Sequence, residues 1–338
     1  MPPNLRKMSL NNRDYSFKNL KFKRFLHFIN NKNKDVIGEN HTSTRKFDSE
    51  NERIINRGFT ALFDPNIETE DIKANVLHSV TKKVWGGNFS SPIENRLIKG
   101  VRVLDVCCGP GYWVLDMAKT YPKSTFIGMD ISPTFSEREK MTNVAFLECN
   151  VHDGLPWPND TFDFVYQRYA WASYNEVQWK NIISEITRVC KPGGMIELME
   201  FDWEFKNNSP ITMNYQKLLS TYFFSNGLNP AISSKIPLLL KQTDELTDIR
   251  SESRDLSLGS WDGLNGMMHL KYHYSSVNQF ANHLSKDTNL SDEEHKLKII
   301  KYLKESENCK TLATNRRFFA IKTTHKKNRH TLDNNSCN

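Results

Sequence analysis

The sequence lacks the features that mark membrane-spanning, secreted or zinc-binding proteins. It has no run of about 18 apolar residues, so no segment is predicted to span a membrane, and it has no signal-peptide core. The six cysteines form no C-x-x-C pair and have no regular spacing, which argues against a zinc site and a disulfide framework. We therefore expect free thiols in a reducing compartment and no bound metal.

The central part of the chain also lacks an excess of positive charge, although the formal net charge is +7. Residues 1–50 hold 11 Lys and Arg against 5 Asp and Glu, and residues 321–338 hold 4 against 1. The excess therefore lies in the two tails, and the core is not expected to bind nucleic acid. Contacts with protein partners are expected only from the basic tails.

Composition divides the chain into three regions. Residues 1–50 are rich in Asn, Lys and Ser and are predicted to be a basic, largely disordered extension. Residues 51–322 form the α/β domain, and 323–338 are a second disordered basic tail. Within the extension, apolar residues from Phe22 to Ile29 recur at helical spacing. This segment could be a mitochondrial presequence, a membrane-surface or partner-binding helix, or a loose element, so the compartment is cytoplasmic or nuclear, with a mitochondrial location possible.

The most informative stretch runs from residue 101 to residue 133. The apolar run 101–106 predicts a buried strand, and a tight glycine-containing turn follows it. Apolar residues then recur at helical spacing up to Tyr121, and a second apolar run ends in Asp130. Strand, glycine turn, helix, strand and acid together form half of a nucleotide-binding sheet, in which Asp130 can accept hydrogen bonds from both hydroxyls of a ribose.

Two cofactor classes use this arrangement, and an ordinary βαβ unit without a ligand is a further alternative. A dinucleotide fold requires a third glycine where this chain has Val114. Asp105, which ends the first strand, would repel a pyrophosphate but suits a cationic ligand such as a sulfonium with an α-amino group. An NAD-dependent oxidoreductase is therefore disfavoured.

The run from Asp105 to Gly111 resembles motif I of class I S-adenosylmethionine (SAM) dependent methyltransferases, D-x-G-x-G-x-G, with Cys107 in place of the first glycine. The ordered motifs between residues 62 and 202, ending in KPGGMIELME, resemble fungal methyltransferases of the LaeA-like and trans-aconitate methyltransferase-like group. This resemblance implies a Rossmann-like class I methyltransferase fold, with a seven-stranded, mostly parallel sheet, helices on both faces and an antiparallel last strand. It also implies a substrate-covering insertion at residues 207–242.

The resemblance assigns roles to individual residues. Asp105 would lie near the amino end of the methionine moiety, and Asp130, with Ile131 beside it, would hold the ribose. The other expected cofactor contacts are Cys107, Gly109 and Gly111 along the methionine moiety, Asn150, Val151 and His152 around the adenine, and Gln167 near the transfer site. Arg168 and Tyr169 are weaker candidates for substrate contact, and Glu200 and Asp202 weaker still.

The expected reaction is methyl transfer from SAM to a small molecule or a protein side chain. Because the sulfonium already activates the methyl group, alignment supplies most of the help, and no catalytic base is assigned. The alternative is a LaeA-like regulatory protein that keeps the fold, acts in a complex and has little or no turnover.

Overall fold

The computed structural model describes residues 70–132, 141–288 and 291–324. Two expectations lie outside these ranges. One concerns residues 1–50, including the helix at 22–29, and the other concerns the tail 323–338, apart from its first two residues.

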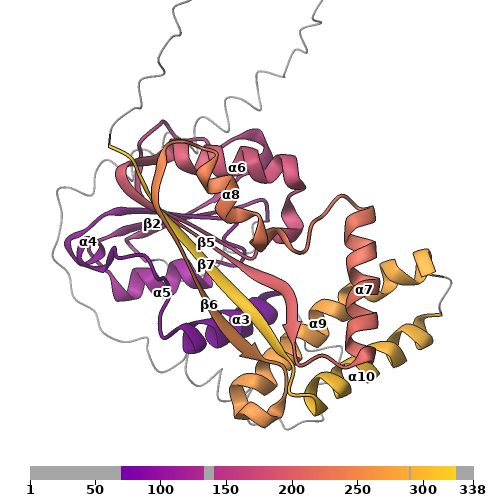
Figure 1. The fold of residues 1–338 in the computed structure, drawn as a ribbon. Helices are drawn as coiled ribbons and strands as arrows, with labels where there is room; N and C mark the ends of the chain where they lie inside the picture. The colour runs from indigo at the N-terminus through magenta and orange to yellow at the C-terminus, as the bar shows by residue number, and fades with distance from the viewer. Residues whose placement is uncertain (1–69, 133–140, 289–290, 325–338) are drawn as a thin grey trace, which may run out of the picture. The chain divides into compact units, whose positions relative to one another are not determined.

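Within the described residues, seven strands form one sheet in the order β3-β2-β1-β4-β5-β7-β6 (Figure 1). The first five strands pair in parallel, and β7 is antiparallel to both β5 and β6. This confirms the predicted Rossmann-like fold of class I methyltransferases. The strands are β1 Arg102–Val106, β2 Thr125–Asp130, β3 Val144–Glu148, β4 Phe162–Arg168, β5 Cys190–Lys206, β6 Leu246–Ser257 and β7 Leu312–Lys322.

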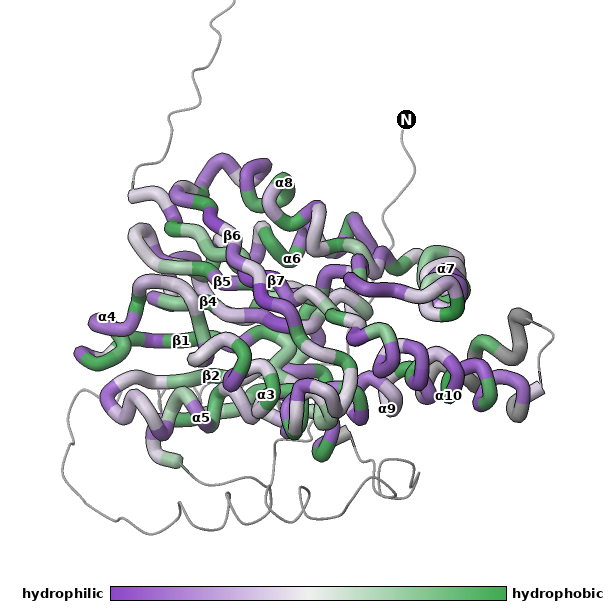
Figure 2. The backbone as a smooth tube through the Cα atoms, turned by 60° about the horizontal axis from the view of Figure 1, so that its bottom comes forward, coloured by the Kyte–Doolittle hydropathy of each residue, from purple (hydrophilic) through white to green (hydrophobic). Residues whose placement is uncertain are grey.

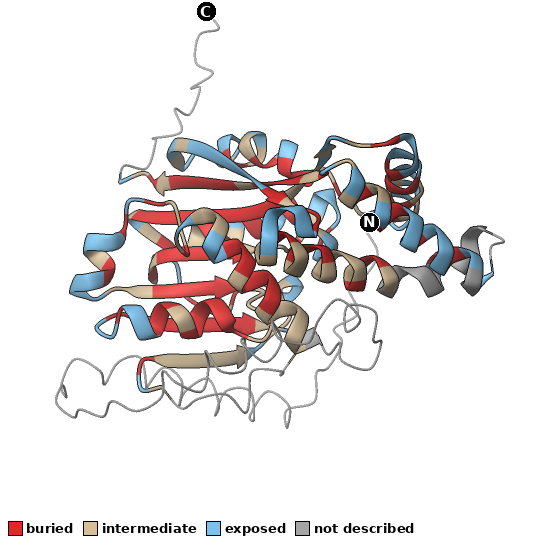
Figure 3. Cartoon of the chain, turned by 90° about the horizontal axis from the view of Figure 1, so that it is seen from below, coloured by how far each residue is buried: buried red, intermediate tan, exposed pale blue. Residues whose placement is uncertain are grey.

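The central strands are buried because helices cover both faces of the sheet, which explains their continuous apolar runs. Figure 3 shows β1, β2 and β4 largely buried, while β3 at one edge is half-buried. The opposite edge strand, β6, carries mostly hydrophilic residues (Figure 2). Because β1, β2, β3 and β4 run parallel, their carboxyl ends meet at one edge of the buried sheet, and that edge positions the site.

Helices α3 Glu70–Trp85, α4 Glu94–Lys99 and α5 Tyr112–Thr120 lie on one face of the sheet, and α6 Glu176–Val189 and α8 Ile236–Lys241 lie on the other (Figure 1). Trp113 of α5 stacks on Tyr166 of β4, with ring centroids 4.0 Å apart. The carboxylate of Asp116 fastens α3 to α5 by accepting hydrogen bonds from His78 at 3.2 Å and Lys82 at 2.7 Å. The helix before the first strand is thereby held beside the glycine turn.

Three helices form a separate layer beyond the carboxyl end of β5. They are α7 Pro210–Ser225, α9 Gly263–Thr288 and α10 Asp292–Asn308, and they share an apolar cluster that includes Tyr215, Phe223 and Tyr302. The extended ends of β5 and β7, which pair as far as Lys206 and Leu312, support this layer.

The structure divides the predicted insertion 207–242 into two parts. Helix α7 joins the α9–α10 layer, whereas α8 covers the sheet beside α6. The second half of this segment therefore packs on the sheet, and two of the three helices of the layer come from residues after 260. That the segment covers the substrate stays a prediction.

Candidate cofactor site and neighbouring pocket

The turn between β1 and α5 has the backbone shape of a ligand cradle. Cys107, Gly109 and Gly111 all have positive φ, at 56°, 54° and 85°. A Cβ at Gly111 would lie 2.5 Å from the ring of Phe146, so packing requires glycine there. A Cβ at Gly109 would meet nothing within 4 Å, so a ligand can approach the backbone at this point. The first N–H groups of α5 have no partners within the helix and are available to such a ligand.

Asp130 at the end of β2 holds this turn in place. Its Oδ2 accepts a hydrogen bond from the Gly109 N–H at 2.8 Å, and its Oδ1 accepts one from the Ser132 N–H at 3.0 Å. Each carboxylate oxygen has a further lone pair, so both can still accept from ribose hydroxyls. Asp130 therefore has a structural role in addition to the ribose contact expected from the sequence.

Asp105 lies beneath the turn and is only 2% exposed. Burial raises the pKa of its carboxyl to about 8; the positive charge of Arg168 opposes this shift, and the negative charge of Asp130 adds to it. Its Oδ1 is buried without a hydrogen-bond partner among the described residues. Because an unpaired buried acceptor costs free energy, this atom is suited to a cationic donor delivered by a ligand.

The adenine candidates lie at the end of β3, next to Asp130. The side chain of Asn150 accepts a hydrogen bond from the His152 N–H at 3.1 Å and so begins the short helical turn Val151–Asp153. Ile131 is 67% exposed. The ring of His152 meets the ring of Tyr174 edge-on at 5.6 Å. These residues provide an apolar surface with polar groups at its rim.

Tyr174 joins the predicted cofactor residues to one another, and the sequence analysis missed it. Its hydroxyl donates to Gln167 Oε1 at 3.1 Å and lies 2.9 Å from Cys107 Sγ. Gln167 is fully buried, and its Nε2 has no partner among the described residues. The signal available in the sequence was the density of aromatic residues in YAWASY, residues 169–174, where a loop was expected.

The two weaker substrate candidates have different surroundings. The Tyr169 hydroxyl is hydrogen-bonded to Thr81 at 2.7 Å and to Asn315 at 2.5 Å, so it fixes α3 and β7 around the loop. The Arg168 guanidinium lies 5.9 Å from the Tyr169 ring centroid and has no ion pair within 4 Å among the described residues. Contact between either residue and an acceptor stays a prediction.

Glu200 and Asp202 also differ. Glu200 is fully buried and accepts a hydrogen bond from the Ala170 N–H at 2.7 Å, while its Oε2 has no partner among the described residues. Burial raises the pKa of Glu200 to about 8, against the effect of the backbone N–H groups of Ala170 and Trp171. Asp202 accepts from Ser233 at 2.5 Å and is paired with Arg316. Glu200 therefore holds the loop after β4, whereas Asp202 ties β5 to its neighbours.

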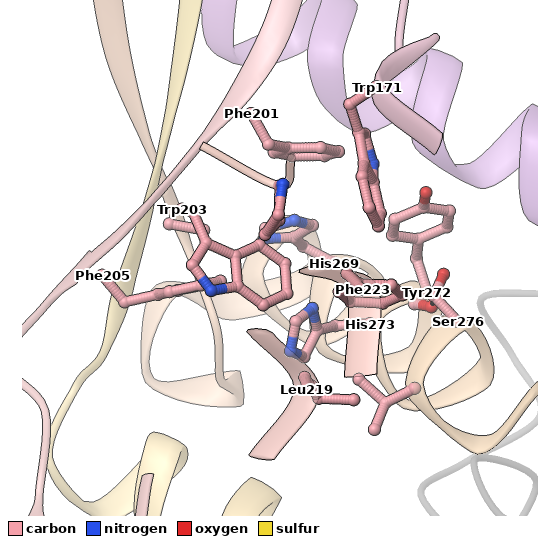
Figure 4. Close-up of a pocket in the computed structure, with 13 residues that line it drawn as sticks. Trp171, Phe201, Trp203, Phe205, Leu219, Phe223, His269, Tyr272, His273 and Ser276 are labelled. Carbon is pink, nitrogen blue, oxygen red and sulfur yellow. Dashed lines mark hydrogen bonds between the residues drawn. The ribbon is translucent and has the colours of Figure 1, made fainter. Parts of the chain in front are cut away.

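A cavity, which we call the aromatic pocket, lies between the carboxyl end of β5 and the layer of α7 and α9 (Figure 4). Trp171, from the loop that Glu200 holds, forms one wall and meets Phe223 edge-on at 4.8 Å. Phe223 both packs in the apolar cluster of the helical layer and lines this pocket. The lining residues are Trp171, Phe201, Trp203, Phe205, Leu219, Phe223, Pro230, His269, Tyr272, His273, Ser276, Val277 and Ala313.

Neither a metal cluster nor a membrane-spanning helix is found in the described part of the chain. No group of three or more His, Cys, Asp or Glu residues there could hold a metal ion. None of the helices described is long and apolar enough to cross a membrane.

Comparisons with known proteins match the region that holds the glycine turn. Residues 103–194 match the family model described as a methyltransferase domain. The demethylmenaquinone methyltransferase of Geobacillus sp. is 26% identical over 165 residues, which cover 46% of this chain and 64% of that protein. The Listeria monocytogenes protein of the same name is 30% identical over 136 residues, 38% of this chain and 54% of the relative. The chain thus spans less than two thirds of either relative.

Among solved structures, the chain is similar to phosphoethanolamine N-methyltransferase 2 of Haemonchus contortus, solved with phosphomonomethylethanolamine and S-adenosylhomocysteine. The TM-score is 0.43 at 16% identity, covering 74% of this chain and 57% of that one. A Bacillus YcgJ protein gives a TM-score of 0.42 at 18% identity and is covered over its full length, 100%, by 74% of this chain.

Proposed function

We propose that the protein is a SAM-dependent methyltransferase that acts on a small molecule. One observation carries the proposal: the buried Asp105 carboxyl, with an unpartnered oxygen, lies beneath an open glycine turn that Asp130 braces. A cationic ligand with ribose hydroxyls matches these groups in charge and hydrogen bonding. The methyltransferase family match over residues 103–194 supports the same reading.

The residues present divide the work of binding among neighbouring strand ends. SAM, when bound, supplies a methyl group activated by its sulfonium. Asp105 would bind the α-amino group, because a buried carboxylate gains most from a cationic partner. Asp130, with Ile131 beside it, would accept from the ribose hydroxyls, and Asn150, Val151 and His152 would surround the adenine. Gln167 and Tyr174 would fix the floor of the site, through the hydrogen bond that joins them.

The loop after β4 connects this site to the aromatic pocket, which we assign to the acceptor. Tyr174 at one end of the loop contacts Cys107, and Trp171 in the middle lines the pocket. Such concave, mostly apolar sites are typical of small-molecule binding. The same loop would therefore align the acceptor with the transferred methyl group, which is the main help this reaction needs.

A LaeA-like regulator of fungal type remains the second candidate, and the basic tails favour it, since they suit contacts with partner proteins. Such a protein would bind SAM without turnover. It would act in the nucleus, whereas an enzyme of this class could also act in the cytoplasm.

Calorimetry on the full chain tests the proposal. SAM and S-adenosylhomocysteine should each bind with a stoichiometry of one molecule per chain, and NAD should bind more weakly. Incubation with labelled SAM and cell extract should then give a labelled small molecule. Tighter binding of NAD than of SAM would overturn the cofactor assignment, and SAM binding without any labelled product would favour the regulator.

A further inference from the structure

The aromatic pocket is lined mostly by aromatic and aliphatic side chains. Its described lining residues include aromatic rings from β5, α7, α9 and the loop after β4, but no Asp, Glu, Lys or Arg. Trp171 and Trp203 stand 6.0 Å apart between centroids, and Phe223 meets both rings edge-on. An anion would lose its hydration here without a counter-charge, and the aromatic walls favour a planar, apolar molecule that packs against the rings.

The wall also contains the polar side chain of His269, and its surroundings determine which of its ring nitrogens carries the hydrogen. It is 1% exposed, and its Nδ1 lies 3.1 Å from the carbonyl oxygen of Ser257. A carbonyl oxygen only accepts, so Nδ1 carries the hydrogen. Burial lowers the pKa of His269 to about 4, so the ring is neutral and Nε2 presents a lone pair. Nε2 has no hydrogen-bond partner among the described residues.

Two neighbouring polar side chains are engaged elsewhere. His273 Nε2 lies 2.6 Å from the Tyr302 hydroxyl, and the Ser276 hydroxyl donates to the Tyr272 carbonyl at 2.9 Å. His269 Nε2 is therefore an acceptor in a wall made mostly of aromatic and aliphatic side chains. A ligand that brings a donor to this position gains a hydrogen bond that an apolar ligand lacks.

We propose that the aromatic pocket binds a neutral, planar aromatic acceptor that carries a hydroxyl group, and that this hydroxyl donates a hydrogen bond to His269 Nε2. This inference rests on the proposed methyl transfer and names its substrate class. The bond would orient the hydroxylated edge of the acceptor within the pocket.

Two probes of nearly the same size test the proposal by equilibrium dialysis at pH 7, with the full chain in the presence of S-adenosylhomocysteine. They are 2-naphthol, which has the donor, and 2-methylnaphthalene, which does not. The wild-type protein should bind 2-naphthol about fivefold more tightly, the factor for one net hydrogen bond of about 1 kcal/mol. Equal binding of the two probes, or no saturable binding of either, would overturn the inference.

Variants separate the hydrogen bond from packing. His269→Asn keeps a donor for the Ser257 carbonyl but removes the Nε2 acceptor, so the preference for 2-naphthol should disappear while 2-methylnaphthalene still binds. His269→Gln places an oxygen near the Nε2 position and should retain the preference, as should the control Ser276→Ala. Retention of the preference in His269→Asn would contradict the proposal. S-adenosylhomocysteine affinity is measured on each protein, so failure of the cofactor assignment is detected separately.

Discussion

At the scale of single residues, Asp105 is a buried carboxyl whose charge would depend on the proposed ligand. Its folded pKa, about 8, lies above the usual value of 3.8 because burial disfavours the carboxylate. The protonated Asp105 carboxyl therefore contributes to the stability of the fold, fully below pH 3.8, and this contribution is lost as the pH rises through 8. A cationic ligand would reverse this preference, because it favours the charged carboxylate.

SAM binding should therefore be coupled to release of a proton from Asp105. In the wild-type protein, affinity should rise between pH 6 and pH 8, by at most about tenfold per pH unit for one proton. The α-amino group of SAM itself titrates near pH 8, so Asp105→Asn provides the reference: its affinity should be weaker and should lack this rise. Calorimetry across this pH range measures both. Parallel pH profiles for the two proteins would exclude Asp105 as the group that binds the cation.

Sequence reasoning grouped residues that lie near one another in the chain, and their contact with a cofactor stays a prediction. Asp105, Gly109 and Gly111 follow from the order of strand and turn, and Asp130 follows from the next strand. Tyr174 could not be assigned in this way, because its partners Cys107 and Gln167 are brought to it only by the packing of the loop after β4. His269 is more distant still, on a helix that begins at Gly263.

At the scale of elements, the loop after β4 joins the two sites. Glu200 holds its backbone at Ala170, the proposed cofactor residues Cys107 and Gln167 contact it at Tyr174, and Trp171 lines the aromatic pocket. Loss of the Glu200 carboxyl would leave the buried Ala170 N–H without its acceptor, at a cost of about 1–3 kcal/mol.

Glu200→Ala should accordingly lower the melting temperature and weaken binding at both the cofactor site and the aromatic pocket. Glu200→Gln keeps an acceptor oxygen and should lose much less. In the wild type, the stability contributed by protonated Glu200 is lost as the pH rises from its usual pKa of 4.5 through its folded pKa of about 8. Glu200→Gln should lack this part of the decline. Thermal melts of both variants from pH 5 to pH 9 measure this. Asp202→Asn, at a neighbouring position engaged with Ser233 and Arg316, is the control for the loop effect. If Glu200→Ala melted at the wild-type temperature and bound both ligands like the wild type, Glu200 would not order the loop.

The order and type of the elements were predictable where apolar periodicity is strong. The strand expected at 101–106 and the second apolar run, which ends in Asp130, agree with β1 and β2 within one residue. Strands β6 and β7 are long and pair from Leu246 and Lys322 to Ser257 and Leu312. The layer of α7, α9 and α10 is formed by contacts across residues 210 to 308, which a local pattern cannot reveal.

At the scale of the whole molecule, all residues of the proposed cofactor site lie within residues 105–200. We therefore predict that a chain beginning at Asn51 binds SAM within a few-fold of the full-length protein. Calorimetry on both chains, with circular dichroism as the check on folding, tests this. A loss of more than tenfold in a folded protein would mean that residues 1–50 contribute to the site.

The central claim is that Asp130 and the glycine turn hold a ribose, and the SAM affinities of Asp130→Ala and Asp130→Asn test it most directly. Hydrogen bonds to a charged group are worth about 1.5–3 kcal/mol each, so loss of one bond should weaken SAM binding by about 10- to 100-fold in Asp130→Ala. Asp130→Asn should lose less, because it keeps one acceptor oxygen.

Both variants should also melt at a lower temperature without ligand, since Asp130 braces Gly109 and Ser132. Affinity is therefore measured at a temperature where each variant is folded by circular dichroism. A graded loss of SAM affinity from wild type through Asp130→Asn to Asp130→Ala is the predicted result. Wild-type SAM affinity in a folded Asp130→Ala protein would contradict the ribose assignment and, with it, the cofactor site proposed for this sheet edge.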